Sequence, residues 1–380
     1  MIWRVRMSKS KTEHFSLCSY GYSLFWVFIS LYISVQVVYA QQNIREYYIS
    51  VEEYDWDYAP SGEDQLRGVP LQDSPMAALY TVSSSTRVGR VYHKARYRKY
   101  RDPEFKQAAE YDPSLGMLGP IIRAEAGDQV RIRFLNRASV PHSLHPHTVQ
   151  NDILAWVPGA AVQPGETYEY VWDVPTTSPG GLWAYSSRAD PLRDLHAGLI
   201  GPIVIYPNNT LHKQTPGSPE RPRGIDQEIF ALMMVTDEAF SPYFLSSTSQ
   251  LQYRNDSDPA FLESNRMYHI NGYVFNNHPG FHMYYGHTVR WYVLSLGLGD
   301  DDVHTAHWHG ATLLHKGHRV DVVDLWPVSF TVLDMIPDNE GQWLFHCHVG
   351  KHFEAGMSAY YQVEKLDYSG KEGWDDDVDF

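Results

Sequence analysis

Histidines, one cysteine and one methionine gather in two short segments near the C-terminal end of the chain. The first contains His304, His307 and His309, and the second contains His346, Cys347, His348, His352 and Met357. Side chains alternate across a β-strand, so residues two apart share a face and the residue between them points away. His346 and His348 can therefore face one metal site while Cys347 faces another. Cys347 with two imidazoles and a distant thioether is the ligand set of a blue-copper centre.

We predict that His304 and His352 supply the imidazoles of this centre and that Met357 supplies the weak axial contact. The thiol and the two histidines that flank it would then join the two metal sites through a few covalent bonds, a short route for electrons. These three residues are predicted to carry the redox chemistry. A zinc site is the weaker alternative, since zinc would favour more thiolates and no thioether.

The start of the chain is typical of a secretory signal peptide, which we predict over residues 1–40. Basic residues precede an apolar run that ends in Val38-Tyr39-Ala40, a small-residue cleavage pattern. An uncleaved signal anchor that tethers the protein to a membrane is the alternative. Cys18 lies within this segment, so the secreted chain would keep Cys347 alone. Secreted proteins usually pair their cysteines, and a single one between two histidines is therefore a candidate metal ligand.

The formal net charge of the chain is −14. Such a charge argues against nucleic acid or an anionic membrane surface as the partner, and it is compatible with attracting cations. Asn208-Asn209-Thr210 and Asn255-Asp256-Ser257 are candidate glycosylation acceptors, consistent with a secreted glycoprotein.

Short runs rich in Val, Ile, Tyr, Phe and Trp, separated by Gly, Pro, Asn and Asp, predict an all-β chain. Its two halves look like copies of one unit, because three motifs recur in order at nearly constant spacing. Residues 127–131 parallel 286–290, residues 142–147 parallel 304–309, and residues 182–185 parallel 342–345. Each copy suits a β-sandwich or barrel. We predict a first domain over residues 41–207, a linker over 208–225, a second domain over 226–366 and an acidic tail over 367–380.

Residues 262–272 and the metal-ligand pattern together resemble the last domain of ceruloplasmin- and hephaestin-type multicopper oxidases. In the N-terminal half, residues 94–100, 118–125 and 198–202 resemble the first domain of the same family, which coagulation factors V and VIII share. The resemblance covers nearly all of the chain after the signal segment. It implies two cupredoxin-like, or plastocyanin-like, Greek-key β-barrels that correspond to the first and last of the family's six domains.

The resemblance also implies a mechanism and a cofactor, which is copper. A ferroxidase-like oxidase would take electrons one at a time from Fe(II) or another donor at the blue copper. The electrons would pass through Cys347 to a three-copper cluster that reduces dioxygen to water. Six of the family's eight cluster histidines have matches here, namely His145, His147, His307, His309, His346 and His348.

The other two cluster histidines are missing. By the internal repeat, Ser186-Ser187-Arg188 stands in the place of His346-Cys347-His348. Loss of the cysteine is ordinary, since the family's first domain carries no blue copper, but loss of both histidines is not. Arg188 would also put a fixed positive charge beside the metal. Two interpretations stay open: an incomplete cluster with impaired oxidase activity, or local substitution by His142 or His196.

Acidic residues near the predicted centre suggest an iron site, and one residue argues against it. Asp300-Asp301-Asp302 precede His304, and Asp237-Glu238 lies where the family has an acidic turn. Ferroxidases of this family are similar in placing carboxylates near the blue copper to bind iron. Lys351, however, stands where ceruloplasmin-like domains have an aspartate. A solvated acidic surface is the alternative interpretation of the aspartates.

The predicted cluster draws ligands from both halves, so neither half can hold it alone. We expect a homotrimer that closes head to tail, with the copper cluster between subunits. An intramolecular arrangement of the two domains is the competing hypothesis. Two further functions stay open besides the oxidase. One is a copper-binding or electron-transfer protein that keeps only the blue centre, and the other is a non-catalytic secreted scaffold.

Overall fold

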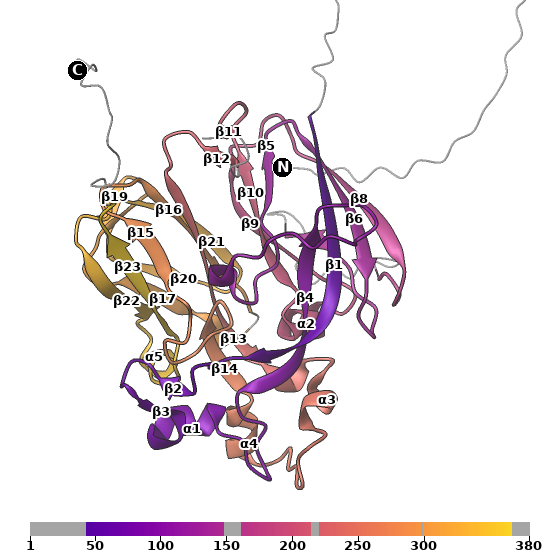
Figure 1. The fold of residues 1–380 in the computed structure, drawn as a ribbon, viewed down its shortest axis with the longest axis vertical. Helices are drawn as coiled ribbons and strands as arrows, with labels where there is room; N and C mark the ends of the chain where they lie inside the picture. Colours follow the sequence, from indigo (N-terminus) through magenta and orange to yellow (C-terminus); the bar gives the residue numbers. More distant parts are fainter. Residues whose placement is uncertain (1–42, 148–160, 214–219, 298, 367–380) are drawn as a thin grey trace, which may run out of the picture.

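Two halves, each built from a pair of β-sheets, lie side by side in the molecule (Figure 1). The computed structural model describes residues 43–147, 161–213, 220–297 and 299–366. The predicted signal peptide and acidic tail lie outside these ranges. Within them, no helix combines the length and the apolar character that a bilayer crossing needs. The all-β prediction is confirmed, since the helices present are short.

The N-terminal half consists of two four-stranded sheets, with strand orders β4-β1-β6-β8 and β5-β10-β9-β7. Their strands are β1 (Ile44–Asp57), β4 (Val91–Tyr100), β5 (Ile122–Glu125), β6 (Gln129–Asn136), β7 (His145–Pro146), β8 (Thr167–Asp173), β9 (Gly181–Ser186) and β10 (Ile200–Tyr206). Buried and partly exposed residues alternate along β6, which gives the strand one face toward the core. Its buried side chains, such as Ile132 and Phe134, fill the space between the two sheets.

The C-terminal half repeats this design with more strands, in the orders β14-β13-β16-β21-β18-β19 and β15-β23-β22-β17-β20. Its strands are β13 (Gln227–Asp237), β14 (Arg266–Ile270), β15 (Phe281–Tyr284), β16 (Val289–Ser295), β17 (His304–Trp308), β18 (Leu313–His315), β19 (His318–Val320), β20 (Val322–Leu325), β21 (Ser329–Met335), β22 (Gly341–Cys347) and β23 (Ser358–Glu364). As in the first half, the first long strand pairs in parallel with a later one, β13 with β16 and β1 with β6.

One segment of the N-terminal half crosses over and covers the C-terminal half. After β1 the chain forms β2 (Glu63–Asp64), β3 (Val69–Pro70), η1 (Leu71–Asp73) and α1 (Pro75–Thr81), which Figure 1 shows below the C-terminal sheets. The indole of Trp56 donates to the carbonyl of Gly272 at 2.6 Å, and the backbone nitrogen of Gln65 donates to the carbonyl of Phe275 at 3.2 Å. Tyr80 of α1 is buried in the C-terminal core.

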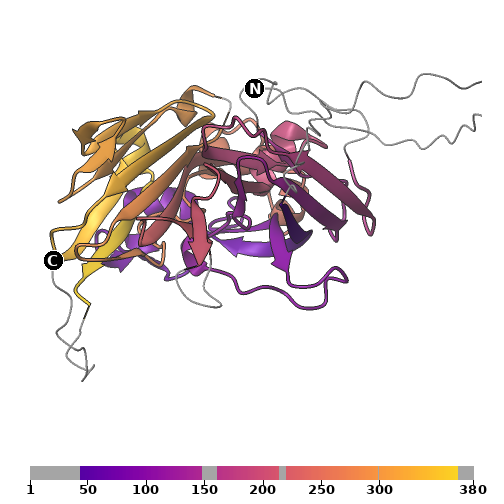
Figure 2. The same ribbon diagram turned by 90° about the horizontal axis from the view of Figure 1, so that it is seen from above.

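A continuous apolar layer joins the two halves, which lie next to each other in both views (Figure 2). Leu182 and Val204 from the N-terminal half pack in one cluster with Phe230, Leu232 and Leu294 from the C-terminal half. The connection between the halves contains the hairpin β11 (Leu211–Lys213) and β12 (Glu220–Pro222). The remaining short elements are η2 (Pro113–Leu115), α2 (Pro191–Ala197), η3 (Glu238–Phe240), α3 (Phe244–Thr248), α4 (Pro259–Ser264), η4 (Asp300–Asp302) and α5 (Gly350–Glu354).

A buried ion pair also joins the halves. Lys94 on β4 and Glu238 in η3 form a direct Nζ–Oε1 contact, and both side chains are almost fully buried. The ammonium group of Lys94 also donates to the carbonyl of His196 at 2.8 Å. Burial lowers the pKa of Lys94 and raises the pKa of Glu238. The interface therefore depends on each charge having the other as its partner.

Replacing Lys94 with methionine will strand the Glu238 carboxylate in the interior. We expect Lys94→Met to lower the free energy of unfolding by about 3–5 kcal/mol, as removal of one partner of a buried pair does. Lys106→Met is the matched control, because Lys106 is exposed in the same half, and it should change stability by less than about 0.5 kcal/mol. Urea unfolding followed by tryptophan fluorescence measures both. Equal midpoints for the two variants would contradict the importance of the pair.

Candidate metal centre

Two neighbouring antiparallel strands, β17 and β22, position the central residues. Their register sets Ala306 opposite Cys347 and His307 opposite His346. Along β17, His304 and Ala306 are buried, whereas His307 is partly exposed. Because successive side chains of a strand point to opposite faces, Cys347 lies on the inner face with His304, and His346 lies on the outer face with His307.

The first group of candidate ligands is buried on the inner face and consists of His304, Cys347 and His352. The sulfur of Cys347 lies 3.8 Å from Nδ1 of His304 and 3.5 Å from Nδ1 of His352. The two Nδ1 atoms are 3.2 Å apart. His352 belongs to α5, which begins at Gly350, shortly after Cys347 in the chain. Three donor atoms from a strand, a strand end and a helix thus converge on one point.

The donor atoms of this group fit a soft, imidazole-binding metal such as copper. The Nδ1 atoms of two neutral imidazoles face each other here, so at most one of them can carry a proton that points at the other. A metal ion between the rings would bind the lone pairs of both Nδ1 atoms. Burial also lowers the pKa of His304 to about 3 and that of His352 to about 4, so both rings are neutral near pH 7. Burial raises the pKa of the Cys347 thiol. Metal binding would therefore release the proton of this thiol.

Met357 follows α5 and precedes β23, and its side chain is buried. Backbone hydrogen bonds tie it to the other candidate ligands: its nitrogen donates to the carbonyl of His352 at 2.9 Å, and its carbonyl accepts from the nitrogen of Cys347 at 3.1 Å. These bonds hold the backbone of Met357 next to the backbones of His352 and Cys347. Its role as an axial ligand stays a prediction.

The second group lies on the outer face and consists of His307, His309 and His346. Nε2 of His346 lies 3.2 Å from Nδ1 of His307 and 3.0 Å from Nε2 of His309. Nδ1 of His346 lies 2.8 Å from the carbonyl oxygen of Cys347. A carbonyl can only accept, so Nδ1 carries the proton and Nε2 offers its lone pair toward the other two rings. The hydrogen bond to the Cys347 carbonyl thus orients the His346 ring so that its Nε2 atom can bind a metal ion.

His348 lies beside the second group, with its ring centroid 5.2 Å from that of His307 and 5.7 Å from that of His346. His307 and His309 also line an open depression of about 450 Å³, together with Trp343. His309 and His348 are exposed. The second group therefore faces the surface, where another protein surface can approach it.

His145 and His147 lie in the N-terminal half and join neither group. Among the described residues, the only groups of three or more histidine, cysteine or acidic residues with converging donor atoms are the two above. Nε2 of His147 lies 2.6 Å from the hydroxyl of Ser186, and His145 pairs across the strands with the same serine. Burial and, to a smaller extent, the positive charge of Arg188 together lower the pKa of His145 to about 4 and that of His147 to about 3.

His142 and His196 are held by other partners. Nδ1 of His142 lies 3.1 Å from Asp194, and its Nε2 lies 2.8 Å from the hydroxyl of Tyr243. Nδ1 of His196 accepts from the backbone nitrogen of Asp237 at 3.2 Å. His142 is thus hydrogen-bonded to a phenol and lies beside a carboxylate, as in a buried structural histidine.

The acidic residues near His304 are partnered rather than free. Asp302 is buried and accepts from the backbone nitrogens of Val235 and Gly299. Asp301 binds Arg266, and Asp237 lies 3.9 Å from the same arginine. The side chain of Asp300 lies outside the described part of the chain. The acidic run therefore supplies no set of three open carboxylates.

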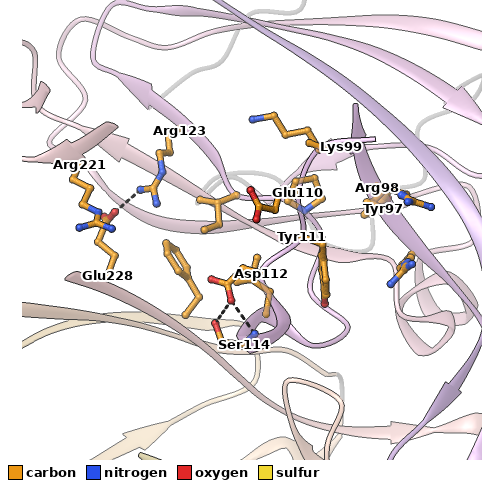
Figure 3. Close-up of a pocket in the computed structure, with 16 residues that line it drawn as sticks. Tyr97, Arg98, Lys99, Glu110, Tyr111, Asp112, Ser114, Arg123, Arg221 and Glu228 are labelled. Atoms are coloured by element: carbon orange, nitrogen blue, oxygen red, sulfur yellow. Dashed lines mark hydrogen bonds and ion pairs between the residues drawn. The ribbon is translucent and has the colours of Figure 1, made fainter. Parts of the chain in front are cut away.

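A cleft of about 400 Å³ is lined by residues of both halves (Figure 3). In it, Arg123 of β5 and Glu228 of β13 form an ion pair at 2.8 Å. Lys99, Glu110 and Arg221 also line it, so its wall carries charges of both signs. It contains no histidine or cysteine, and it does not belong to the candidate metal centre.

Two sequence models described as multicopper oxidase match the chain, one over residues 111–210 and the other over residues 244–367. The chain belongs to the multicopper oxidase family, and copper is the metal that this family uses.

Among curated proteins, the chain is similar to rat hephaestin, with 37% identity over 342 residues, which are 85% of this chain and 29% of that protein. It is 34% identical to the human ferroxidase HEPHL1 over 343 residues (84% and 29%) and 35% identical to human ceruloplasmin over 336 residues (84% and 30%). The chain thus spans less than a third of the length of these relatives.

Solved structures support the fold. A crystal structure of a multicopper oxidase superposes with a TM-score of 0.55 at 19% identity, covering 86% of this chain and 91% of the other. A copper nitrite reductase from Nitrosomonas europaea gives the same TM-score at 16% identity, covering 85% and 94%. The expected cupredoxin-like fold is confirmed.

Proposed function

We propose that the protein is a secreted, ferroxidase-like multicopper oxidase that takes electrons one at a time from Fe(II) or another donor and reduces dioxygen to water. One observation carries this proposal. The buried group of His304, Cys347 and His352 and the outer histidine group are joined through the backbone of residues 346 and 347.

Each residue of the centre has a separate task in this proposal. Bound copper would supply one-electron chemistry and the reduction of dioxygen. His304 and His352 hold the inner site from two different elements, which fixes its geometry. Cys347 links the inner site to His346 through covalent bonds and through the hydrogen bond from the His346 ring to the Cys347 carbonyl. The buried surroundings of Cys347 exclude water from the inner site.

Relatives support the choice of Fe(II) as a first donor to test, since one of them is named a ferroxidase. Secretion rests on the predicted signal peptide and on similarity to hephaestin and ceruloplasmin. We also propose the domain limits given above, with residues 41–207 and 226–366 as units. The hairpin of β11 and β12 between β10 and β13 supports a connection over residues 208–225.

We propose that the copper cluster forms between subunits of a homotrimer. The outer histidine group contains C-terminal residues alone and opens to the surface, while His145 and His147 belong to the N-terminal half. A head-to-tail contact would bring the N-terminal half of one subunit onto the C-terminal half of the next, and such contacts close into rings. Light scattering of the copper-loaded protein tests this. A monomer that keeps all of its copper would contradict the trimer.

Oxygen uptake tests the oxidase function. Copper-loaded protein should consume one dioxygen molecule for every four electrons taken from the donor, without accumulation of hydrogen peroxide. A Clark electrode with catalase measures both quantities, because catalase returns oxygen only where peroxide has formed. Production of peroxide as the main product, or no uptake with any one-electron donor, would contradict the proposal.

A copper protein that keeps only the blue centre is the second candidate function. Ser186 and Arg188 favour it, since they occupy the positions of two cluster histidines and Arg188 places a cation beside His145 and His147. This protein would be reduced by a donor without consuming oxygen, and the uptake measurement separates the two functions.

A further inference from the structure

The cleft that residues of both halves line carries more basic than acidic side chains. Five of its lining residues are basic, namely Arg96, Arg98, Lys99, Arg123 and Arg221, and three are acidic, namely Glu110, Asp112 and Glu228. The chain as a whole is acidic, with a formal net charge of −14. Clefts in which one sign of charge predominates concentrate solutes of the opposite sign. This cleft is therefore a place where an acidic protein can attract an anion.

One of the three carboxylates, that of Glu228, is already bound by groups of the protein itself. It forms an ion pair with Arg123 at 2.8 Å and accepts hydrogen bonds from the hydroxyls of Tyr206 and Tyr292, each at 2.8 Å. Its side chain is almost fully buried. The charge of Glu228 is therefore balanced within the wall, and it opposes an anion in the cleft only weakly.

The other two carboxylates differ in how they are held. Asp112 accepts from the backbone nitrogen of Ser114 at 2.9 Å and so caps the short helix η2. Glu110 forms no ion pair within the described ranges and lies in the middle of the cleft wall (Figure 3). Glu110 is thus the carboxylate whose charge most directly opposes an anion here.

Two cations of the wall, Lys99 and Arg221, have no carboxylate within ion-pairing distance among the described residues. The ammonium of Lys99 lies 5.0 Å from the centre of the Tyr47 ring, and the guanidinium of Arg221 donates to the backbone carbonyl of Asp226. Figure 3 shows Lys99 extending toward the side of the cleft where Arg123 and Arg221 lie. Both positive groups are therefore available to a ligand.

The surroundings of Lys99 favour an added negative charge. Partial burial at the cleft wall and, to a smaller extent, the positive charge of Arg123 lower the pKa of Lys99. Both effects disfavour the charged ammonium. An anion beside Lys99 would offset them, because an opposite charge stabilises the ammonium form.

We propose that this cleft binds a small polyvalent oxyanion, one that carries several phosphate or carboxylate oxygens. A volume of about 400 Å³ falls in the usual range of small-molecule sites, about 300–1,000 Å³. Lys99 supplies a point charge, and the planar guanidinium of Arg221 can bind two oxygens at once. The cleft uses no residue of the candidate metal centre, so this proposal does not depend on the oxidase function.

The position of the two cations gives the ligand a structural effect. Lys99 belongs to β4 of the N-terminal half, whereas Arg221 belongs to β12 in the connection between the halves. The cleft wall continues into the C-terminal half at Phe230 of β13. An anion held by both cations would link these parts, and a ligand that binds only the folded protein stabilises it.

Isothermal titration calorimetry of the copper-loaded protein tests the proposal, with inorganic pyrophosphate and citrate as separate probes. At least one of them should bind with a Kd below about 1 mM in 0.15 M NaCl. The anion that binds more tightly shows whether phosphate or carboxylate groups are preferred. The same anion should raise the Tm of the protein.

Substitutions of opposite sign in the same cleft make the test specific. Lys99→Gln and Arg221→Gln should each weaken binding by about tenfold, since each removes a charged hydrogen-bond donor. Glu110→Gln should tighten binding by about threefold, because it removes the opposing carboxylate. Lys99→Arg keeps the charge and should keep most of the affinity. Lys106→Gln is the matched control and should change nothing, because Lys106 is exposed and does not line the cleft.

Both probes also chelate copper, and the variants separate this effect from binding in the cleft. Heat from chelation would be the same in every variant, so it cannot weaken with Lys99→Gln and strengthen with Glu110→Gln. A Kd above about 1 mM for both anions would overturn the proposal. Affinity that ignores Lys99→Gln and Arg221→Gln, or that falls with Glu110→Gln, would overturn it as well.

Discussion

Cys347→Ser will abolish the intense visible absorption band of the copper-loaded protein and lower oxygen uptake by at least about a hundredfold. The band requires a thiolate bound to copper, and Cys347 is the one cysteine among the described residues. Replacing a residue that only hydrogen-bonds to a metal ligand lowers metal affinity or activity by about 10–100-fold. Loss of a ligand itself should therefore lower oxygen uptake by more. Serine has nearly the same shape and can accept the backbone N–H of Thr305, which lies 3.4 Å from the sulfur.

Met357→Leu is the matched control for the loss of a sulfur ligand. An axial thioether is a weak contact, so this variant should keep the visible band with a shifted reduction potential. Circular dichroism should show both variants folded. A Cys347→Ser protein that stays blue would contradict the assignment of the inner site.

Replacing Ser186 and Arg188 together with histidine should raise the copper content and increase oxygen uptake by about tenfold. Ser186 contacts Nε2 of His147, and Arg188 adds a positive charge that lowers the pKa of both His145 and His147. A cation that disfavours a proton on these rings also disfavours a copper ion beside them. The double variant removes this repulsion and restores imidazoles at both positions.

Metal analysis of the purified proteins measures their copper content. Each single variant should gain less copper than the double variant. Arg193→His is the control, because it places a histidine at an exposed arginine of the neighbouring helix α2 and should change neither copper content nor uptake. An unaltered protein that already binds about four coppers per chain, with no gain in the double variant, would show that the cluster does not need these positions.

The strand pattern predicted much of the candidate site. Alternation along β17 and β22 places Cys347 inward and His346 outward, and this follows from local spacing alone. The all-β class also followed from short apolar runs between turn residues. These features are local in the chain, so a single sequence contains them.

Contacts between distant segments could not be predicted in the same way. Tyr80 reaches Glu263 because the segment after β1 crosses to the C-terminal half, and no local pattern specifies that crossing. Arg266 forms an ion pair with Asp301, and Lys351 lies 3.8 Å from the same residue of the acidic run that the sequence suggested as an iron site. Likewise, Tyr243 binds His142 across 101 positions of the chain.

Copper analysis and an absorption spectrum of one purified sample test the central claim most directly. An inner thiolate site joined to a histidine cluster predicts an intense visible band together with a near-ultraviolet shoulder from bridged coppers, at more than one copper per chain. A colourless protein after copper loading would contradict the account.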